Sequence, residues 1–308
     1  MTEVRDPLAQ SVHTRLRNYA HQTKEDFNLV LSRYASERFL YRLSKSQHTD
    51  RFILKGASLF LIWMNRMHRP THDIDLLGYG KIDAEELRNI FSECCNLAVV
   101  ADGVIFDPNS IAIEDIREAQ VYMGLRVTIH GHLGSARLHI QIDIGTGDAV
   151  VPDPQTMDYP VLLDFPSPQL RVYPKEAVIA EKIDAMIERG LRNSRMKDYY
   201  DIWLLSTDFD FEGRILVSAI RETLARRKRK CETFPIGLTS EFSKSPDKQK
   251  QWTAFMNKQR ILPLNTLDDT IKMLQRFLNE PLKAVISNSN FDAVWIKNTQ
   301  WQPRDIIV

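Results

Sequence analysis

Cysteine is scarce in this chain of 308 residues. Its three cysteines, Cys94, Cys95 and Cys231, are too few and too unevenly spaced for a disulfide framework or a four-cysteine zinc site. Long apolar runs are lacking as well, since the longest, at 59–64, is far shorter than the roughly 18 residues of a membrane helix. The N-terminus has no apolar run of the signal-peptide kind. These absences favour a cytoplasmic protein that does not enter a membrane.

Neither sign of charge is in excess, and several well-known catalytic motifs are missing. The 41 Lys and Arg residues oppose 40 Asp and Glu residues, so any affinity for nucleic acid must come from a local patch. The chain has no G-x-x-x-x-G-K-[ST] loop, no G-x-G-x-x-G turn and no H-E-x-x-H motif. We therefore expect neither a P-loop or Rossmann nucleotide site nor a catalytic zinc ion.

The spacing of apolar residues predicts an α/β (α+β) protein with a small mixed sheet in a first domain, 1–160. Residues 7–47 are expected to form a helical cap, and 130–137 to link an antiparallel hairpin. Strands are predicted at 52–55, 73–77, 121–129 and 138–144, and further helices at 59–67 and 83–96.

A proline-rich connection at 151–174 indicates the passage to a second, mainly helical domain, 161–308. Between the helices of this domain, 232–262 is expected to be a long polar loop with one short helix. The predicted helices cover 174–189, 197–206, 213–231 and 265–285.

The pair Asp73 and Asp75 carries the strongest chemical signal. In a strand, residues two apart project on the same side, so both carboxylates share one face while Ile74 and Leu76 point to the core. Two adjacent carboxylates repel each other, and Mg²⁺ or Mn²⁺ is the usual ion that holds them together. The spacing alone is weak evidence, because Asp208 and Asp210 repeat it in what we interpret as a solvated turn.

The surroundings of the aspartates add to this signal. The segment Lys55-Gly56-Ala57-Ser58 lies at a strand-to-helix turn, where exposed backbone N–H groups can hold phosphate oxygens. Asp143 supplies a third carboxylate, on the hairpin face that it shares with His139 and Gln141 and that points away from the apolar row. Arg69 and Thr71 lie just before the aspartates. The combination indicates metal-assisted phosphoryl or nucleotidyl transfer.

Two segments resemble motifs of the AbiEii/AbiGii-type toxin family, within the DNA polymerase β-like nucleotidyltransferase superfamily. The first motif is KGAS at 55–58 with RPTHDIDL at 69–76, and the second is AEKIDA at 180–185 with NSRMKDYYDIW at 193–203. The resemblance spans roughly residues 50–206. In one departure, the usual Gly-Ser turn of the superfamily is Gly56-Ala57 here, with Ser58 one position later.

The resemblance implies a role for each residue that matches the motifs. Asp73 and Asp75 would ligate Mg²⁺ or Mn²⁺, Asp143 would be a third ligand or a base, and Lys182 with Asp198 would complete a catalytic site in a cleft between the domains. The residues expected to bind the nucleotide are Lys55, Gly56, Ser58, Arg69, Thr71, Arg195, Lys197 and Asp201. Asp201 is included because it shares a helix face with Asp198.

Basic residues concentrate in two stretches. The first contains Arg189, Arg192, Arg195 and Lys197, and the second, 221–260, holds eleven Lys or Arg against four Asp or Glu. Such a local patch is typical of a surface that binds a nucleic-acid backbone. The alternative, a solvated helix face with internal charge partners, remains open because the run at 226–230 covers every side of a helix.

The resemblance implies a bacterial toxin of a toxin–antitoxin or phage-defence pair, with a cognate antitoxin as a partner. Its reaction would transfer a nucleoside monophosphate from an NTP to RNA, with a tRNA 3′ end as the expected acceptor. Two alternatives stay open: transfer of a nucleotide or phosphate to a protein or small molecule, and a catalytically silent module that binds RNA or a partner.

Overall fold

The computed structural model describes residues 6–66, 69, 71, 73–118, 122–231, 233–259 and 266–304, without the side chains of 117, 118, 122 and 123. The chain divides into two compact units: Met1–Gly147 with Gln155–Val172, and Asp148–Pro154 with Tyr173–Val308. The first unit extends beyond the predicted boundary at residue 160 because strand β8 pairs in parallel with β1.

Within the described residues, the first unit contains an eight-stranded mixed sheet, which confirms the predicted α/β class. The strand order is β3-β5-β6-β2-β1-β8-β7, with β4 paired to β5. At the centre, β2 lies parallel to β6 and antiparallel to β1. The strands are β1 (Phe52–Lys55), β2 (Asp73–Gly78), β3 (Val104–Phe106), β4 (Ala112–Glu118), β5 (Tyr122–Leu133), β6 (Ala136–Thr146), β7 (Gln155–Asp158) and β8 (Gln169–Val172).

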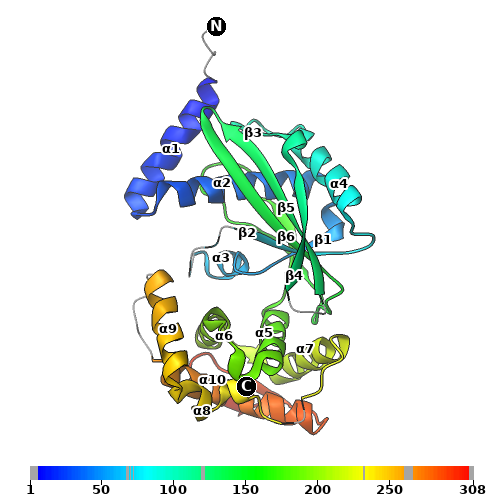
Figure 1. Ribbon diagram of the computed structural model, residues 1–308, viewed down its shortest axis with the longest axis vertical. Coiled ribbons are helices and arrows are strands. Elements are labelled where there is room, and N and C mark those ends of the chain that lie inside the picture. Colours follow the sequence, from blue (N-terminus) through cyan, green and yellow to red (C-terminus); the bar gives the residue numbers. More distant parts are fainter. Residues whose placement is uncertain are drawn as a thin grey trace. The chain divides into compact units, whose positions relative to one another are not determined.

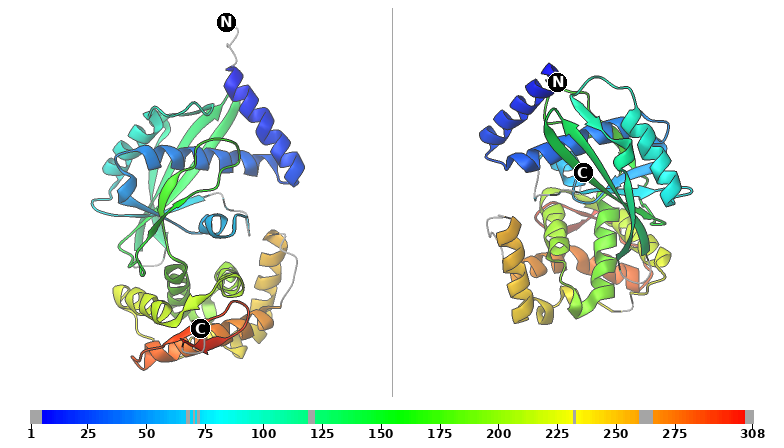
Figure 2. Two further views of the ribbon diagram at one scale, coloured as in Figure 1. Left: turned by 180° about the vertical axis from the view of Figure 1, so that it is seen from behind. Right: turned by 45° about the horizontal axis from the view of Figure 1, so that its top comes forward.

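In the described part of this unit there are four α-helices: α1 (Pro7–Thr23), α2 (Phe27–Lys45), α3 (Leu59–Met64) and α4 (Ala84–Asn96). Figures 1 and 2 show α2 crossing one face of the sheet over the long strands β5 and β6. Phe39 of α2 packs edge-on against Phe91 of α4 and Phe106 of β3, all buried. Helices α2 and α4 therefore cover an apolar face of the sheet. On β2 and β6, Asp73, Asp75 and Asp143 alternate with buried apolar residues and so lie on the opposite, polar face.

Local sequence signals explain several of these elements. Asp83 accepts a hydrogen bond of 2.9 Å from the backbone N–H of Glu86, which is the N-cap that starts α4. The predicted helix at 59–67 is shorter than expected, because α3 ends at Met64 and is followed by Asn65, whose φ is 52°. The expected link at 130–137 is also wrong: both strands of the hairpin continue to a turn at Gly134, whose φ is 58°.

The second unit is mainly helical, as predicted. Its helices are α5 (Lys175–Arg189), α6 (Met196–Asp208), α7 (Gly213–Arg226), α8 (Ser240–Lys244), α9 (Pro246–Gln259) and α10 (Leu267–Ile286). A small sheet of order β11-β10-β9 accompanies them, formed by β9 (Phe211–Glu212), β10 (Ala293–Trp295) and β11 (Trp301–Pro303). Trp301 stacks on Phe277, and Trp295 packs edge-on against it. Both tryptophans donate their indole N–H groups to backbone carbonyls.

The prediction of one long loop with a single short helix at 232–262 is wrong. This stretch contains α8 and the fourteen-residue helix α9. The apolar pattern of α9 is sparse, and its buried side chains are Lys248, Trp252 and Met256. No helix in the described part of the chain has the length and apolar character needed to cross a membrane.

Candidate active site

Strand register places four charged residues in one row across the polar face of the sheet. Lys55 of β1 lies opposite Asp75 of β2, Asp75 lies beside Asp143 of β6, and Asp143 lies opposite Arg126 of β5. Side chains at paired positions of neighbouring strands project from the same face. The fold therefore brings together two of the predicted carboxylates, which are 68 positions apart in the sequence.

Arg126 binds Asp143, a contact that the sequence analysis did not anticipate. Its Nε and Nη2 atoms each donate a hydrogen bond of 2.8 Å, one to each carboxylate oxygen of Asp143. Hydrogen bonding to Asp143 raises the pKa of Arg126, so the guanidinium stays charged. Such bidentate pairs are among the stronger hydrogen-bonded ion pairs. Asp143 is thus held by a protein cation in this structure.

Within the described residues, no group of three His, Cys, Asp or Glu side chains is arranged to hold a metal ion. Asp73 and Asp75 still offer the hard oxygen donors that Mg²⁺ and Mn²⁺ prefer, from one strand face. The assignment of Asp73, Asp75 and Asp143 as metal ligands stays a prediction. For Asp143 it requires that Arg126 first release the carboxylate.

Position 56 has no room for a side chain, because Asp75 approaches the backbone of Gly56 closely. A Cβ atom placed on Gly56 would lie 1.9 Å from Oδ2 of Asp75, and the residue has a φ of +77°. Either condition alone disfavours a side chain at this position. The turn after β1 is therefore built directly against one of the predicted catalytic carboxylates.

The other predicted phosphate-binding residues are less directly supported. Ser58 is 6% exposed, and its hydroxyl donates to the carbonyl of Lys55 at 3.3 Å, which closes the turn internally. Arg69 and Thr71 are described, whereas the motif residues Pro70 and His72 lie outside the described residues. Nucleotide binding by Lys55, Gly56, Ser58, Arg69 and Thr71 stays a prediction.

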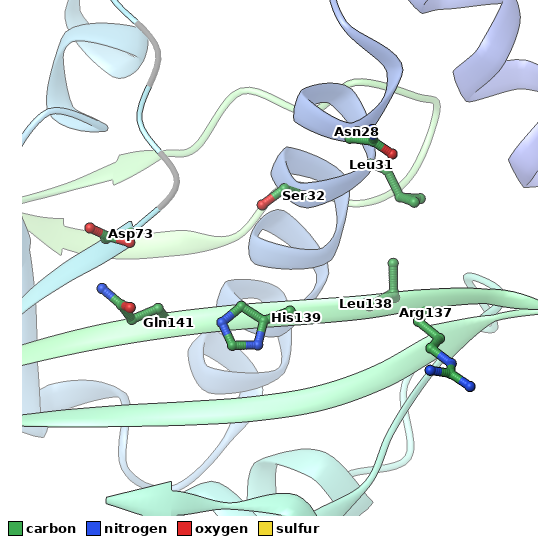
Figure 3. Close-up of a pocket in the computed structure, with 8 residues that line it drawn as sticks. All are labelled: Asn28, Leu31, Ser32, Asp73, Arg137, Leu138, His139 and Gln141. Atoms are coloured by element: carbon green, nitrogen blue, oxygen red, sulfur yellow. The ribbon is translucent and has the colours of Figure 1, made fainter. Parts of the chain in front are cut away.

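A pocket of about 380 Å³ adjoins Asp73. Figure 3 shows that it lies between the beginning of α2 and strand β6, with Asp73 and Gln141 at one end and Arg137 at the other. Its lining comprises Asn28, Leu31, Ser32, Asp73, Arg137, Leu138, His139 and Gln141. The sequence placed His139 and Gln141 on the polar face, but no sequence signal connected them with α2.

In the second unit, Lys182 of α5 links two buried aspartates of α6. Its Nζ lies 3.0 Å from Oδ1 of Asp198 and 2.8 Å from Oδ2 of Asp201, and Arg195 Nε donates to Asp198 Oδ2 at 2.6 Å. Burial alone would raise the pKa of Asp198, but the charges of Lys182 and Arg195 lower it. The motif residues thus meet in one ion-pair cluster. Their catalytic roles stay predictions, as does nucleotide binding by Arg195, Asp201 and the exposed Lys197.

Part of the predicted basic surface is engaged in contacts within the protein. Asp184 of α5, which is 1% exposed, accepts from Arg227 at 2.8 Å and also from Arg229. Arg227 further contacts Asp148 at 3.0 Å. Burial would lower the pKa of Arg227, but nearby acidic groups raise it. The run at 226–230 is therefore partly a structural ion-pair network.

A protein family and two solved structures are similar to this chain. The model of the family described as Nucleotidyl transferase AbiEii toxin, Type IV TA system, matches residues 38–277. Two solved structures from Helicobacter pylori are similar to the chain. JHP933 has a TM-score of 0.46 at 15% identity, over 82% of this chain and 90% of that one. A protein named putative nucleotidyltransferase has a TM-score of 0.44 at 15% identity, over 82% of this chain and 94% of that one. No curated protein matches the chain.

Proposed function

We propose a reaction for this protein, which belongs to the AbiEii family of nucleotidyl transferase toxins of type IV toxin–antitoxin systems. In this reaction it transfers a nucleoside monophosphate from an NTP to an RNA hydroxyl. The observation that carries this proposal is the row in which Asp75 and Asp143 lie side by side, with Asp73 two residues before Asp75. A tRNA 3′ end is the proposed acceptor. The proposed setting is a toxin–antitoxin or phage-defence pair, with a cognate antitoxin encoded beside the gene.

Asp73 and Asp75 would hold the metal ion, and Asp143 would join them once separated from Arg126. A bound Mg²⁺ would supply positive charge to offset the negative charge of the triphosphate. Lys55, at the other end of the row, and the turn at Gly56 would hold phosphate oxygens beside the carboxylates. These roles use hard oxygen donors on one strand face, which is the donor chemistry that Mg²⁺ favours.

The proposed reaction has one substitution step. The acceptor oxygen attacks the α-phosphorus of the NTP, and a new phosphorus–oxygen bond forms. The bond from that phosphorus to the oxygen bridging to the β-phosphate breaks, and pyrophosphate leaves with that oxygen. Asp143 accepts the proton of the attacking hydroxyl, because it lies on β6, the strand next to β2 that carries Asp73 and Asp75.

The direct test uses purified protein, each labelled NTP in turn, total tRNA and Mg²⁺. Asp73→Asn removes one carboxylate of the row, and Asp158→Asn is the matched control, because Asp158 is exposed on β7 of the same unit. We expect label transfer by the wild type and by Asp158→Asn, and at least a 100-fold loss in Asp73→Asn. No transfer with any NTP, or equal transfer by Asp73→Asn, contradicts the proposal.

The salt bridge between Arg126 and Asp143 favours one alternative, a catalytically silent module that binds RNA or a partner. In that case the pair is permanent and the carboxylate row has no metal to hold. Calorimetry separates the two functions: a strong Mg²⁺-dependent NTP signal excludes the silent module, and RNA binding without that signal supports it. If label appears on a protein or small molecule while RNA is unchanged, mass spectrometry of the products identifies a different acceptor.

A further inference from the structure

The pocket beside Asp73 has walls of mixed chemistry. Leu31 and Leu138 are 7% and 3% exposed and supply apolar surface, while Ser32 and Gln141 are half-buried. Within the described residues, the side chains of Ser32 and Gln141 have no protein hydrogen-bond partner. The volume of about 380 Å³ lies within the range of about 300–1,000 Å³ that is usual for small-molecule sites.

The polar groups of this pocket suit a nucleoside. A carboxamide such as that of Gln141 or Asn28 both donates and accepts, which matches the edge of a nucleobase. The imidazole of His139 offers a ring on which a base can stack. Apolar surface from Leu31 and Leu138 suits the face of a planar ring.

The two ends of the pocket differ in charge. Asp73 lies at one end, opposite Gln141 in the register of β2 and β6, and Arg137 lies four residues earlier on β6. Four residues of strand span roughly 13 Å. Figure 3 shows the Arg137 and Asp73 side chains at opposite ends. A ligand with a hydroxyl near Asp73 and a phosphate near Arg137 would form favourable contacts at both ends of the pocket. The last nucleotide of an RNA strand carries these two groups, a free hydroxyl and the phosphate that joins it to the strand.

The carboxylates separate this pocket from the turn at Gly56. In the sheet, β2 lies between β1 and β6; the turn follows β1, and the pocket is lined by β6. Phosphoryl transfer places the attacking and leaving oxygens roughly in line, on opposite sides of the phosphorus. If the NTP phosphates lie at the turn, the attacking hydroxyl approaches from the side of β6.

We infer that the pocket between α2 and β6 binds the terminal nucleoside of the RNA acceptor and presents its hydroxyl at Asp73. The inference rests on the proposed nucleotidyl transfer and adds the position of the acceptor. Gln141 and Ser32 recognise the base and ribose, Arg137 binds the phosphate that joins this nucleoside to the rest of the strand, and the incoming NTP occupies the other side of the carboxylates.

The test compares pocket variants with matched controls in the transfer assay. Gln141→Ala is paired with Gln10→Ala and Arg137→Ala with Arg17→Ala, since Gln10 and Arg17 are exposed on α1 outside the pocket. KM is measured for the RNA at saturating NTP and for the NTP at saturating RNA. We expect each pocket variant to raise KM for RNA by about tenfold, with KM for NTP within twofold of the wild type. Both controls should match the wild type.

Other outcomes overturn the inference. A rise in KM for the NTP, with KM for the RNA unchanged, assigns the pocket to the incoming nucleotide. No change in either KM means that the pocket binds no substrate. If the wild type transfers no label, the proposed function fails, and the pocket is tested separately by titrating the four nucleoside monophosphates while following the His139 imidazole by NMR. Saturable binding that Gln141→Ala weakens then supports the pocket as a nucleoside site, and absence of binding overturns it.

Discussion

Arg126 and Asp143 lie opposite each other on β5 and β6, and the guanidinium binds both oxygens of the carboxylate at 2.8 Å. The same carboxylate is adjacent to Asp75 on β2. Asp143 therefore stands between a cation on one side and a second carboxylate on the other. If a metal ion binds the row, it competes with Arg126 for Asp143.

This competition predicts that Arg126→Ala strengthens Mn²⁺ binding. Removing the guanidinium releases Asp143 and takes one positive charge from the row, and we expect an affinity about tenfold higher, which corresponds to about 1.4 kcal/mol. The Arg126 side chain is 38% exposed, so the free energy of unfolding should change by less than about 1 kcal/mol. Titration calorimetry with Mn²⁺ measures the effect, with Arg17→Ala as the control. Equal affinities in the variant and the wild type would mean that Asp143 is not a metal ligand.

A second prediction concerns the turn after β1. Gly56 and Gly80 have nearly equal φ values, +77° and +78°, but a Cβ at Gly56 would meet Asp75 at 1.9 Å, whereas the nearest atom at Gly80 is Arg51 Nη2 at 3.9 Å. Gly80→Ala should therefore cost only the backbone strain, about 1 kcal/mol of unfolding free energy. Gly56→Ala should cost clearly more, about 2–4 kcal/mol, because Asp75 must also move. Urea denaturation of both variants checks this, and equal losses would show that the contact is readily relieved.

Periodicity along the chain predicted which face each residue of a strand occupies. Leu138, Ile140, Ile142 and Ile144 are buried, and Asp143 lies on the other face, as expected from alternation. What the sequence could not supply is register between distant strands, because pairing depends on packing across the whole sheet. Arg126 follows an ordinary alternating pattern, and nothing in its neighbourhood indicates that it faces Asp143.

Among the helices, too, some features could be predicted from the sequence and others could not. The end of α5 was predictable from Gly190, whose φ is 48°. Helix α9 was missed because Trp252 and Met256 are its only buried apolar side chains, so its helical period is weak. The pocket beside Asp73 was also missed, since it forms only when the start of α2 packs near β6.

A third prediction concerns pH and Glu37 of α2. Burial raises the pKa of Glu37 to about 7, despite the charge of Arg38 at 2.9 Å. A carboxyl group whose pKa is higher in the folded state binds more protons when folded, so stability falls as pH rises from about 4.5 to about 7. The expected loss is on the order of 3 kcal/mol. Urea denaturation at pH 5, 6 and 7 should show this slope in the wild type and in Glu85→Gln, an exposed control on α4. In Glu37→Gln the slope should be flatter, and an unchanged slope would contradict the assignment.

A fourth prediction addresses the ion-pair cluster of the second unit. Lys182→Ala would leave Asp198 and Asp201, which are 0% and 1% exposed, without their shared cation. We expect a loss of about 3–5 kcal/mol in unfolding free energy. Lys272→Ala is the control, because Lys272 pairs with Asp268 while 62% exposed, and it should cost at most about 0.5 kcal/mol. Comparable losses in the two variants would show that burial does not decide the strength of these pairs.

The last prediction concerns which basic residues would contact RNA under the proposed function. Arg227 and Arg229 are bound to Asp184, and Lys248 is buried and donates to the carbonyl of Asn193. Lys250 and Lys258 of α9 are exposed, so they are better placed to contact phosphates. Each phosphate contact contributes roughly 0.7 to the slope of log affinity against log salt for single-stranded RNA.

The double variant Lys250→Gln with Lys258→Gln should therefore bind RNA more weakly and lower that slope by about 1.4. Lys272→Gln on α10 is the matched control and should leave the slope unchanged. Filter binding at several salt concentrations measures both. If the double variant does not alter the slope, the RNA binds elsewhere on the protein. If RNA affinity does not depend on salt at all, phosphate contacts are not its source, because each phosphate contact releases counterions.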